Sequence, residues 1–114
     1  MAYPPEHLAY LIYITVPTKE EALLIARSVI QEKLAACANI LPQATSVYEW
    51  QGTMEQTEET VLILKSTAKS YRDLEQRVID LHSYECPCIV ALPIQEGHSA
   101  FLSWIKMQSM GQST

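Results

Sequence analysis

The sequence predicts an α+β protein in which strands and helices follow one another as strand, helix, strand, strand, helix, strand. Three observations predict this class. Two segments carry apolar residues at helical spacing, other segments are rich in β-branched and aromatic residues, and a Gln-Gly pair separates two long strand-like arms. With 114 residues and 48% hydrophobic content, we expect one domain spanning residues 1–114 with a substantial core.

The amino-terminal third predicts a strand followed by a helix. Residues 8–16 are apolar, β-branched or aromatic on both alternating faces, which is typical of a central strand covered on both sides. Thr18 and Glu21 have the spacing of a capping box, so a helix is expected to begin there. Its predicted buried stripe consists of Leu23, Ala26, Ile30 and Leu34.

A long hairpin is predicted next, with residues 36–50 and 53–66 as its arms and a turn near Gln51 and Gly52. Pro42 interrupts the first arm, which predicts a bulge or an unpaired edge stretch. The arms are long for so small a domain. Part of the hairpin is therefore expected to project and to need something to pack against.

The remaining segments predict a helix, a short strand and a final helix. In residues 68–82 the helical repeat is Tyr71, Leu74, Val78 and Leu81. The segment "CIVALPI" predicts a short buried strand, and residues 97–109 predict a helix that buries Phe101, Leu102 and Ile105. The order βαββαβ plus a carboxy-terminal helix is the ferredoxin-like split βαβ topology, here with a long hairpin between the second and third strands.

Charge and hydropathy narrow the range of partners. The net charge is −5 with no run of like charges, which argues against nucleic acid or an anionic membrane as a partner. No stretch approaches the ~20 apolar residues that span a bilayer, and the amino-terminal segment lacks the features of a secretory signal. We therefore expect a cytoplasmic protein in which Cys37, Cys86 and Cys88 are reduced thiols.

Four blocks of sequence carry a family resemblance: "EKLAACANILPQATSVYEWQG", "ETVLILKST", "HSYECPCIVALPI" and "FLSWI". In order and spacing they resemble the CutA proteins, the divalent-cation-tolerance family. The resemblance implies a homotrimer of ferredoxin-like subunits to which the long hairpins contribute, a link to tolerance of copper and other divalent ions, and an overall design similar to the PII signalling trimers. The PII trimers bind small effectors between subunits.

The family's bacterial copper site does not carry over intact to this sequence. The resemblance places its first-strand cysteine at Ile14 and its adjacent histidine pair at Leu81 and His82, so one ligand of three remains. This chain also has Ser83 and Cys88 where the family commonly has a proline and a glutamate. The sequence therefore predicts no required cofactor, and a copper or other divalent ion only as a possible ligand.

The chain's own soft-metal candidates are Cys86 and Cys88, with His82 as a third ligand. Residues two apart in an extended chain point to the same side, so both thiols can meet one soft ion such as Cu(I). In the alternative interpretation, Cys88 is the first core residue of the last strand and Cys86 is a turn residue. His82 would then only end a helix, where a histidine favourably meets the helix dipole. Cys37, in an apolar setting, is expected to be a buried inert thiol.

Five further residues match positions of the resembled family: Trp50, Glu59, Lys65, Tyr84 and Glu85. One hypothesis places several of them in a cleft between subunits, where they orient a small ligand. The alternative is a network of salt bridges and hydrogen bonds that fixes the trimer. No arrangement of nucleophile, acid and base stands out, so we expect a non-catalytic protein. Two functions remain: metal binding by a trimer, or a PII-like sensor or scaffold for a small effector or partner.

Overall fold

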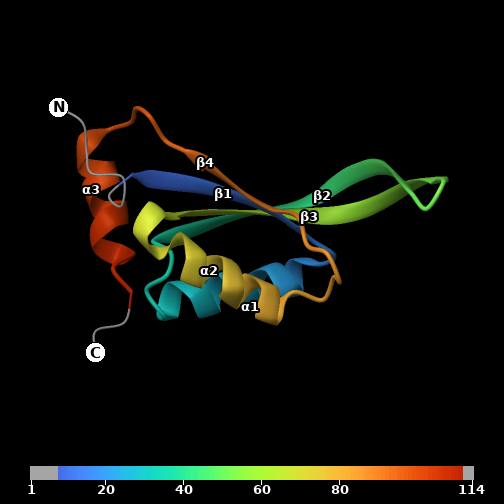
Figure 1. The fold of residues 1–114 in the computed structure, drawn as a ribbon, viewed down its shortest axis with the longest axis horizontal. Helices are drawn as coiled ribbons and strands as arrows, with labels where there is room; N and C mark the ends of the chain where they lie inside the picture. Colours follow the sequence, from blue (N-terminus) through green and yellow to red (C-terminus); the bar gives the residue numbers. More distant parts are fainter. Residues whose placement is uncertain (1–7, 112–114) are drawn as a thin grey trace.

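The computed structural model describes residues 8–111, and its elements follow the predicted order (Figure 1). The strands are β1 (Ala9–Val16), β2 (Cys37–Trp50), β3 (Thr53–Thr67) and β4 (Ile89–Pro93). The helices are α1 (Lys19–Gln31), α2 (Ala68–Leu81) and α3 (Ser99–Gln108). The sheet has the order β2-β3-β1-β4, with every neighbouring pair antiparallel. The predicted α+β class and ferredoxin-like topology are confirmed.

The predicted start of α1 is confirmed, but its buried face differs from the prediction. Thr18 Oγ1 accepts a hydrogen bond from the Glu21 backbone N–H at 3.1 Å, as the cap spacing indicated. Ala26 is buried as predicted, and Leu34 packs against the core from just beyond the end of the helix, but Ile30 is 36% exposed. Apolar residues occupy more than one side of α1, so helical spacing alone did not select the side that packs. The buried residues are Ala22, Ile25, Ala26 and Val29.

The long hairpin forms as predicted, and its outer end extends beyond the helices (Figure 1). Gln51 and Gly52 make a two-residue turn with φ of 51° and 82°, the positive values that the favoured hairpin turns require. Leu41 pairs with Val61 and Ala44 pairs with Glu59, so β2 contains one more residue than β3 between these pairs. This bulge contains Pro42, as expected, and leaves β3 regular.

Helices α1 and α2 cover one face of the sheet and close the main core (Figure 1). Strands β1 and β3 supply Ile12, Ile14, Val16, Leu62 and Leu64, all fully buried. The helical repeat predicted for α2 is confirmed: Leu74 and Val78 are fully buried, and Tyr71 and Leu81 pack against this core. The hydrophobic core on the covered face is therefore formed entirely by residues of a single chain.

The opposite face of the sheet, which we call the open face, is not covered in the same way. Cross-strand partners share a face, and the pairing register places Leu11, Tyr13, Leu41, Ile63, Val90 and Leu92 together on it. Tyr13 is 36% exposed and Leu92 is 51% exposed. The expectation that the first strand is covered on both sides is therefore wrong for the chain by itself, because this fold places both long helices on one face.

The prediction of a buried last strand is also wrong. Among the described strands, β4 lies at the edge of the sheet and pairs with β1 alone, and Val90 is 49% exposed. Cys88, directly before it, is exposed and is not a core residue. A strand at the edge of a sheet has a neighbouring strand on one side only. The apolar composition of β4 therefore predicted more burial than the structure shows.

Helix α3 packs at one end of the sheet through a small second cluster that includes Ile105, Ala9 and Ala36 (Figure 1). Leu102 is partly buried there, as predicted. Phe101 is 41% exposed, contrary to prediction, and stacks on Trp104 with ring centroids 5.7 Å apart. No helix within residues 8–111 is long and apolar enough to cross a membrane. Residues 1–7, on which the expectation about a secretory signal partly rests, lie outside the described residues.

Candidate functional site

The loop between α2 and β4 begins at a buried histidine with both ring nitrogens occupied. His82 follows the last residue of α2 and its side chain is fully buried. Nδ1 accepts a hydrogen bond from the Tyr84 backbone N–H at 3.1 Å, which leaves Nε2–H to donate to the Thr15 carbonyl at 2.8 Å. His82 therefore links the loop to β1 through Nε2.

Two carboxylates hold the same end of the loop. Glu21 Oε2 accepts from the Ser83 backbone N–H at 3.0 Å and lies 3.5 Å from His82 Nδ1. The Tyr84 hydroxyl donates to Glu59 Oε2 at 2.8 Å, and the Glu59 residue is only 8% exposed. Burial, this hydrogen bond and the negative charge of Glu59 raise the pKa of Tyr84. Tyr84 therefore stays protonated near neutral pH and keeps its hydrogen bond to Glu59.

The two thiols of the loop lie beyond these anchors. Cys86 and Cys88 are both free and exposed, and Glu85 is exposed beside them. His82, the third predicted metal ligand, is buried and engaged elsewhere. In the part of the chain that the structure describes, no group of three or more His, Cys, Asp or Glu side chains lies together so as to hold a metal ion. The structure thus presents an exposed thiol pair without a gathered third ligand.

The predicted cleft residues lie in different parts of the molecule. Trp50 ends β2 at the tip of the hairpin and is 56% exposed. Lys65 lies on the open face, and its Nζ donates to Asn39 Oδ1. Because β3 has no bulge, Glu59 and Lys65 are on one side of that strand, but their hydrogen-bond partners differ. Only Tyr84 and Glu59 of the five are joined by a described hydrogen bond.

Sequence reasoning missed two members of the anchor. Glu21 was interpreted only through its capping-box position, and Thr15 only as a strand residue. The residues they bind, Ser83 and His82, are 62 and 67 positions away in the chain. No local spacing rule relates positions so distant, so only the packing of α2 against β1 and α1 revealed the contacts.

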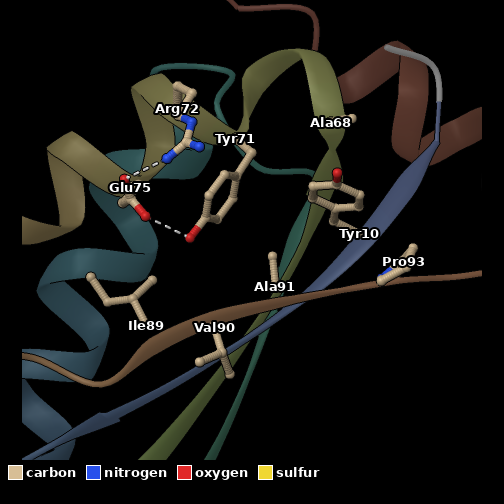
Figure 2. A pocket seen from close by; sticks show the side chains of 9 residues that line it. All are labelled: Tyr10, Ala68, Tyr71, Arg72, Glu75, Ile89, Val90, Ala91 and Pro93. Atoms are coloured by element: carbon tan, nitrogen blue, oxygen red, sulfur yellow. Dashed lines mark hydrogen bonds and ion pairs between the residues drawn. The ribbon is translucent and has the colours of Figure 1, made fainter. Parts of the chain in front are cut away.

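A cavity of about 510 Å³ lies between α2 and β4 (Figure 2), and no sequence pattern indicated it. Tyr10 and Tyr71 meet edge to face there, with ring centroids 5.9 Å apart. The Tyr71 hydroxyl donates to Glu75 at 2.8 Å, and Arg72 Nη1 lies 3.4 Å from the other Glu75 oxygen (Figure 2). Both carboxylate oxygens of Glu75 already have partners within the chain, so the cavity offers a ligand this paired polar cluster beside aromatic and apolar side chains.

Fold and site together define a class: a ferredoxin-like α+β protein with a projecting hairpin and an anchored loop after its second helix. A sequence profile described as "CutA1 divalent ion tolerance protein" matches residues 10–108. The chain belongs to this family, and the predicted family resemblance is confirmed.

Relatives from several kinds of organism support this assignment. The divalent-cation tolerance protein CutA of Thermus thermophilus is 45% identical over 96 residues, which cover 84% of this chain and 93% of that protein. The chloroplastic CutA of Arabidopsis thaliana is 42% identical over 84% of this chain, but the match covers only 53% of that protein. The chain therefore spans about half the length of the plant relative.

Solved structures agree with the sequence comparisons. The divalent cation tolerance protein (Cut A1) from Thermus thermophilus superposes with a TM-score of 0.87 at 42% identity, covering 89% of this chain and 98% of that one. The periplasmic divalent cation tolerance protein CutA from Archaeoglobus fulgidus gives a TM-score of 0.85 at 40% identity, with coverage of 89% and 98%.

Proposed function

We propose that this protein acts in divalent-cation tolerance as a homotrimer that binds copper or another soft or divalent metal ion and catalyses no reaction. The family name describes tolerance of ions and specifies no reaction. The observation that carries the proposal is the open face, a sheet surface with apolar side chains left exposed by the single chain.

The open face supports self-association for a physical reason. Leu41, Val90 and Leu92 are each about half exposed on it. Contiguous exposed apolar surface is uncommon on monomeric proteins and marks interaction sites. Copies of the same chain are the proposed occupants, because a symmetric assembly also gives each projecting hairpin a surface to pack against.

The metal-binding part of the proposal is supported by the family and by two exposed thiols. Thiolates favour soft ions such as Cu(I) and also bind Zn(II). We propose the cytoplasm as the compartment, where both thiols would remain reduced. Relatives are described as chloroplastic and as periplasmic, so compartment differs within the family.

A second candidate is a PII-like sensor or scaffold that binds a small effector or protein partner in clefts between subunits. The cavity between α2 and β4 favours it, because β4 is an edge strand of the sheet within residues 8–111, and another copy can close an open groove there. The Tyr84–Glu59 hydrogen bond offers a polar group held in a fixed position. In this case Glu59 or Lys65 substitutions would alter the response to ligand while trimers persist.

Native mass spectrometry of the reduced protein, alone and with stoichiometric Cu(I), Cu(II) or Zn(II), tests the proposal. The expected species contains three chains of 12.9 kDa each, with bound metal in at least one of the loaded samples. A monomer at micromolar concentration would overturn the homotrimer. A trimer that retains none of the ions would overturn the metal-binding part and direct attention to the effector candidate.

A further inference from the structure

Packing in the core does not explain the two cysteines of the loop after α2. Free cysteine is among the most buried residue types, yet Cys86 and Cys88 are both exposed and neither belongs to a described hydrophobic cluster. Their positions therefore leave the sulfur atoms open to a ligand.

The segment carrying the thiols is fixed at both ends. On its amino-terminal side, His82, Glu21 and Glu59 hold Ser83 and Tyr84 by three hydrogen bonds. On its carboxy-terminal side, Ile89 begins β4 and pairs with Ile14. Four residues separate these two attachments, and Pro87 among them locks its own φ and restricts Cys86 to extended conformations. A ligand that joins the two thiols therefore orders little additional chain.

The number of available ligands limits which ion this segment suits. A closed zinc site uses four protein ligands, and no group of three metal-binding side chains lies together in residues 8–111. His82 cannot serve as a third ligand without losing its bond to Thr15 or to Tyr84. Soft thiolate ligands favour monovalent copper, and two of them suffice for that ion, which accepts linear two-coordinate geometry.

We propose that Cys86 and Cys88 of one chain bind a single Cu(I) ion as a two-thiolate site that excludes His82. This inference rests on the metal-binding part of the proposed function and specifies its ligands and its ion. Each thiol loses its proton to the solvent as its sulfur binds copper, so one Cu(I) ion replaces two protons and the loaded site carries one negative charge. No electron is transferred in this step.

The test titrates reduced protein with Cu(I) in competition with a chromogenic Cu(I) chelator and counts bound ions by native mass spectrometry. Wild type is expected to hold one Cu(I) per chain. Cys86→Ser and Cys88→Ser are each expected to weaken Cu(I) binding by about a hundredfold or more, because a lone thiolate lacks the chelate. Cys37→Ser, which removes the third thiol, is the matched control and should bind like wild type. X-ray absorption at the copper edge should show two sulfur neighbours and no imidazole nitrogen.

The outcomes that overturn the inference differ from those that overturn the proposed function. If the Cys86→Ser/Cys88→Ser double variant binds as much copper as wild type, the copper site lies elsewhere and the metal-binding function still stands. One ion per two chains, or an imidazole ligand, would overturn the two-thiolate site within one chain. Failure of wild type to retain Cu(I), Cu(II) or Zn(II) would overturn both the site and the metal-binding function. Far-UV circular dichroism on each variant ensures that the chain compared is folded.

Discussion

The two faces of the sheet use similar residues with different results. On the covered face, Ile14 and Leu64 are fully buried under α1 and α2. On the open face of the same strands, Tyr13 pairs with Ile63 and remains 36% exposed. Alternating side chains of one strand thus serve two purposes. One set closes the core of the chain, and the other stays partly exposed on the open face.

The anchored loop shows the same division on a smaller scale. His82 is buried and has partners for both ring nitrogens, whereas Cys86 and Cys88, a few residues later, are exposed. Polar groups that leave water need partners, and β1, α1 and β3 supply them at the start of the loop. The buried part fixes the position of the exposed part.

The largest expected effect comes from the covered face. Leu64→Ala should lower the free energy of unfolding by about 2–5 kcal/mol, since it removes a fully buried side chain and leaves a cavity. Urea denaturation at a fixed protein concentration measures this loss. A loss below about 1 kcal/mol would contradict the distinction between the two faces.

A charge on the open face is expected to affect assembly more than folding. Leu92→Glu should leave the far-UV circular dichroism unchanged and shift the proposed trimer toward monomer, because an interface would have to bury an unpaired carboxylate. Analytical ultracentrifugation reads the change. Ile79→Glu is the matched control: Ile79 is 43% exposed on α2, outside the open face, and its variant should stay trimeric. If the two variants have the same oligomeric state, the open face is not part of the interface.

The smallest expected effect appears at high pH beside the covered face. Burial, the hydrogen bond to Glu75 and the charge of Glu75 raise the pKa of Tyr71 from 10.0 to about 12. The folded chain therefore holds this proton more tightly than the unfolded chain. The resulting stabilisation is present below about pH 10 and is lost as the pH rises from about 10 to about 12.

Tyr71→Phe removes this titration, so the variant's stability should fall less steeply over that range than wild type. Thermal melts at intervals between about pH 9 and about pH 12 give the two curves. Tyr84 contributes in the same direction and remains in the variant, so part of the slope should persist. If the stability curves of wild type and variant run parallel over this range, Tyr71 has the same pKa in the folded and the unfolded chain.

Local rules in the sequence determined the elements and their order. The capping residue Thr18, the Gln51-Gly52 turn and the bulge at Pro42 all lie where the sequence indicated, since each depends on neighbouring residues and backbone geometry. The repeat in α2 was also readable, because its buried positions form one clear stripe.

Tertiary structure alone decided which apolar surfaces are covered and which polar groups meet. Sequence composition could not place the last strand at an exposed edge or choose the packed side of α1, because both depend on which elements become neighbours. It could not link Glu21 to Ser83 or His82 to Thr15 either, since these contacts join positions 62 and 67 residues apart. Propensity and periodicity act over a few residues, whereas burial and long-range hydrogen bonds exist only once the chain has folded.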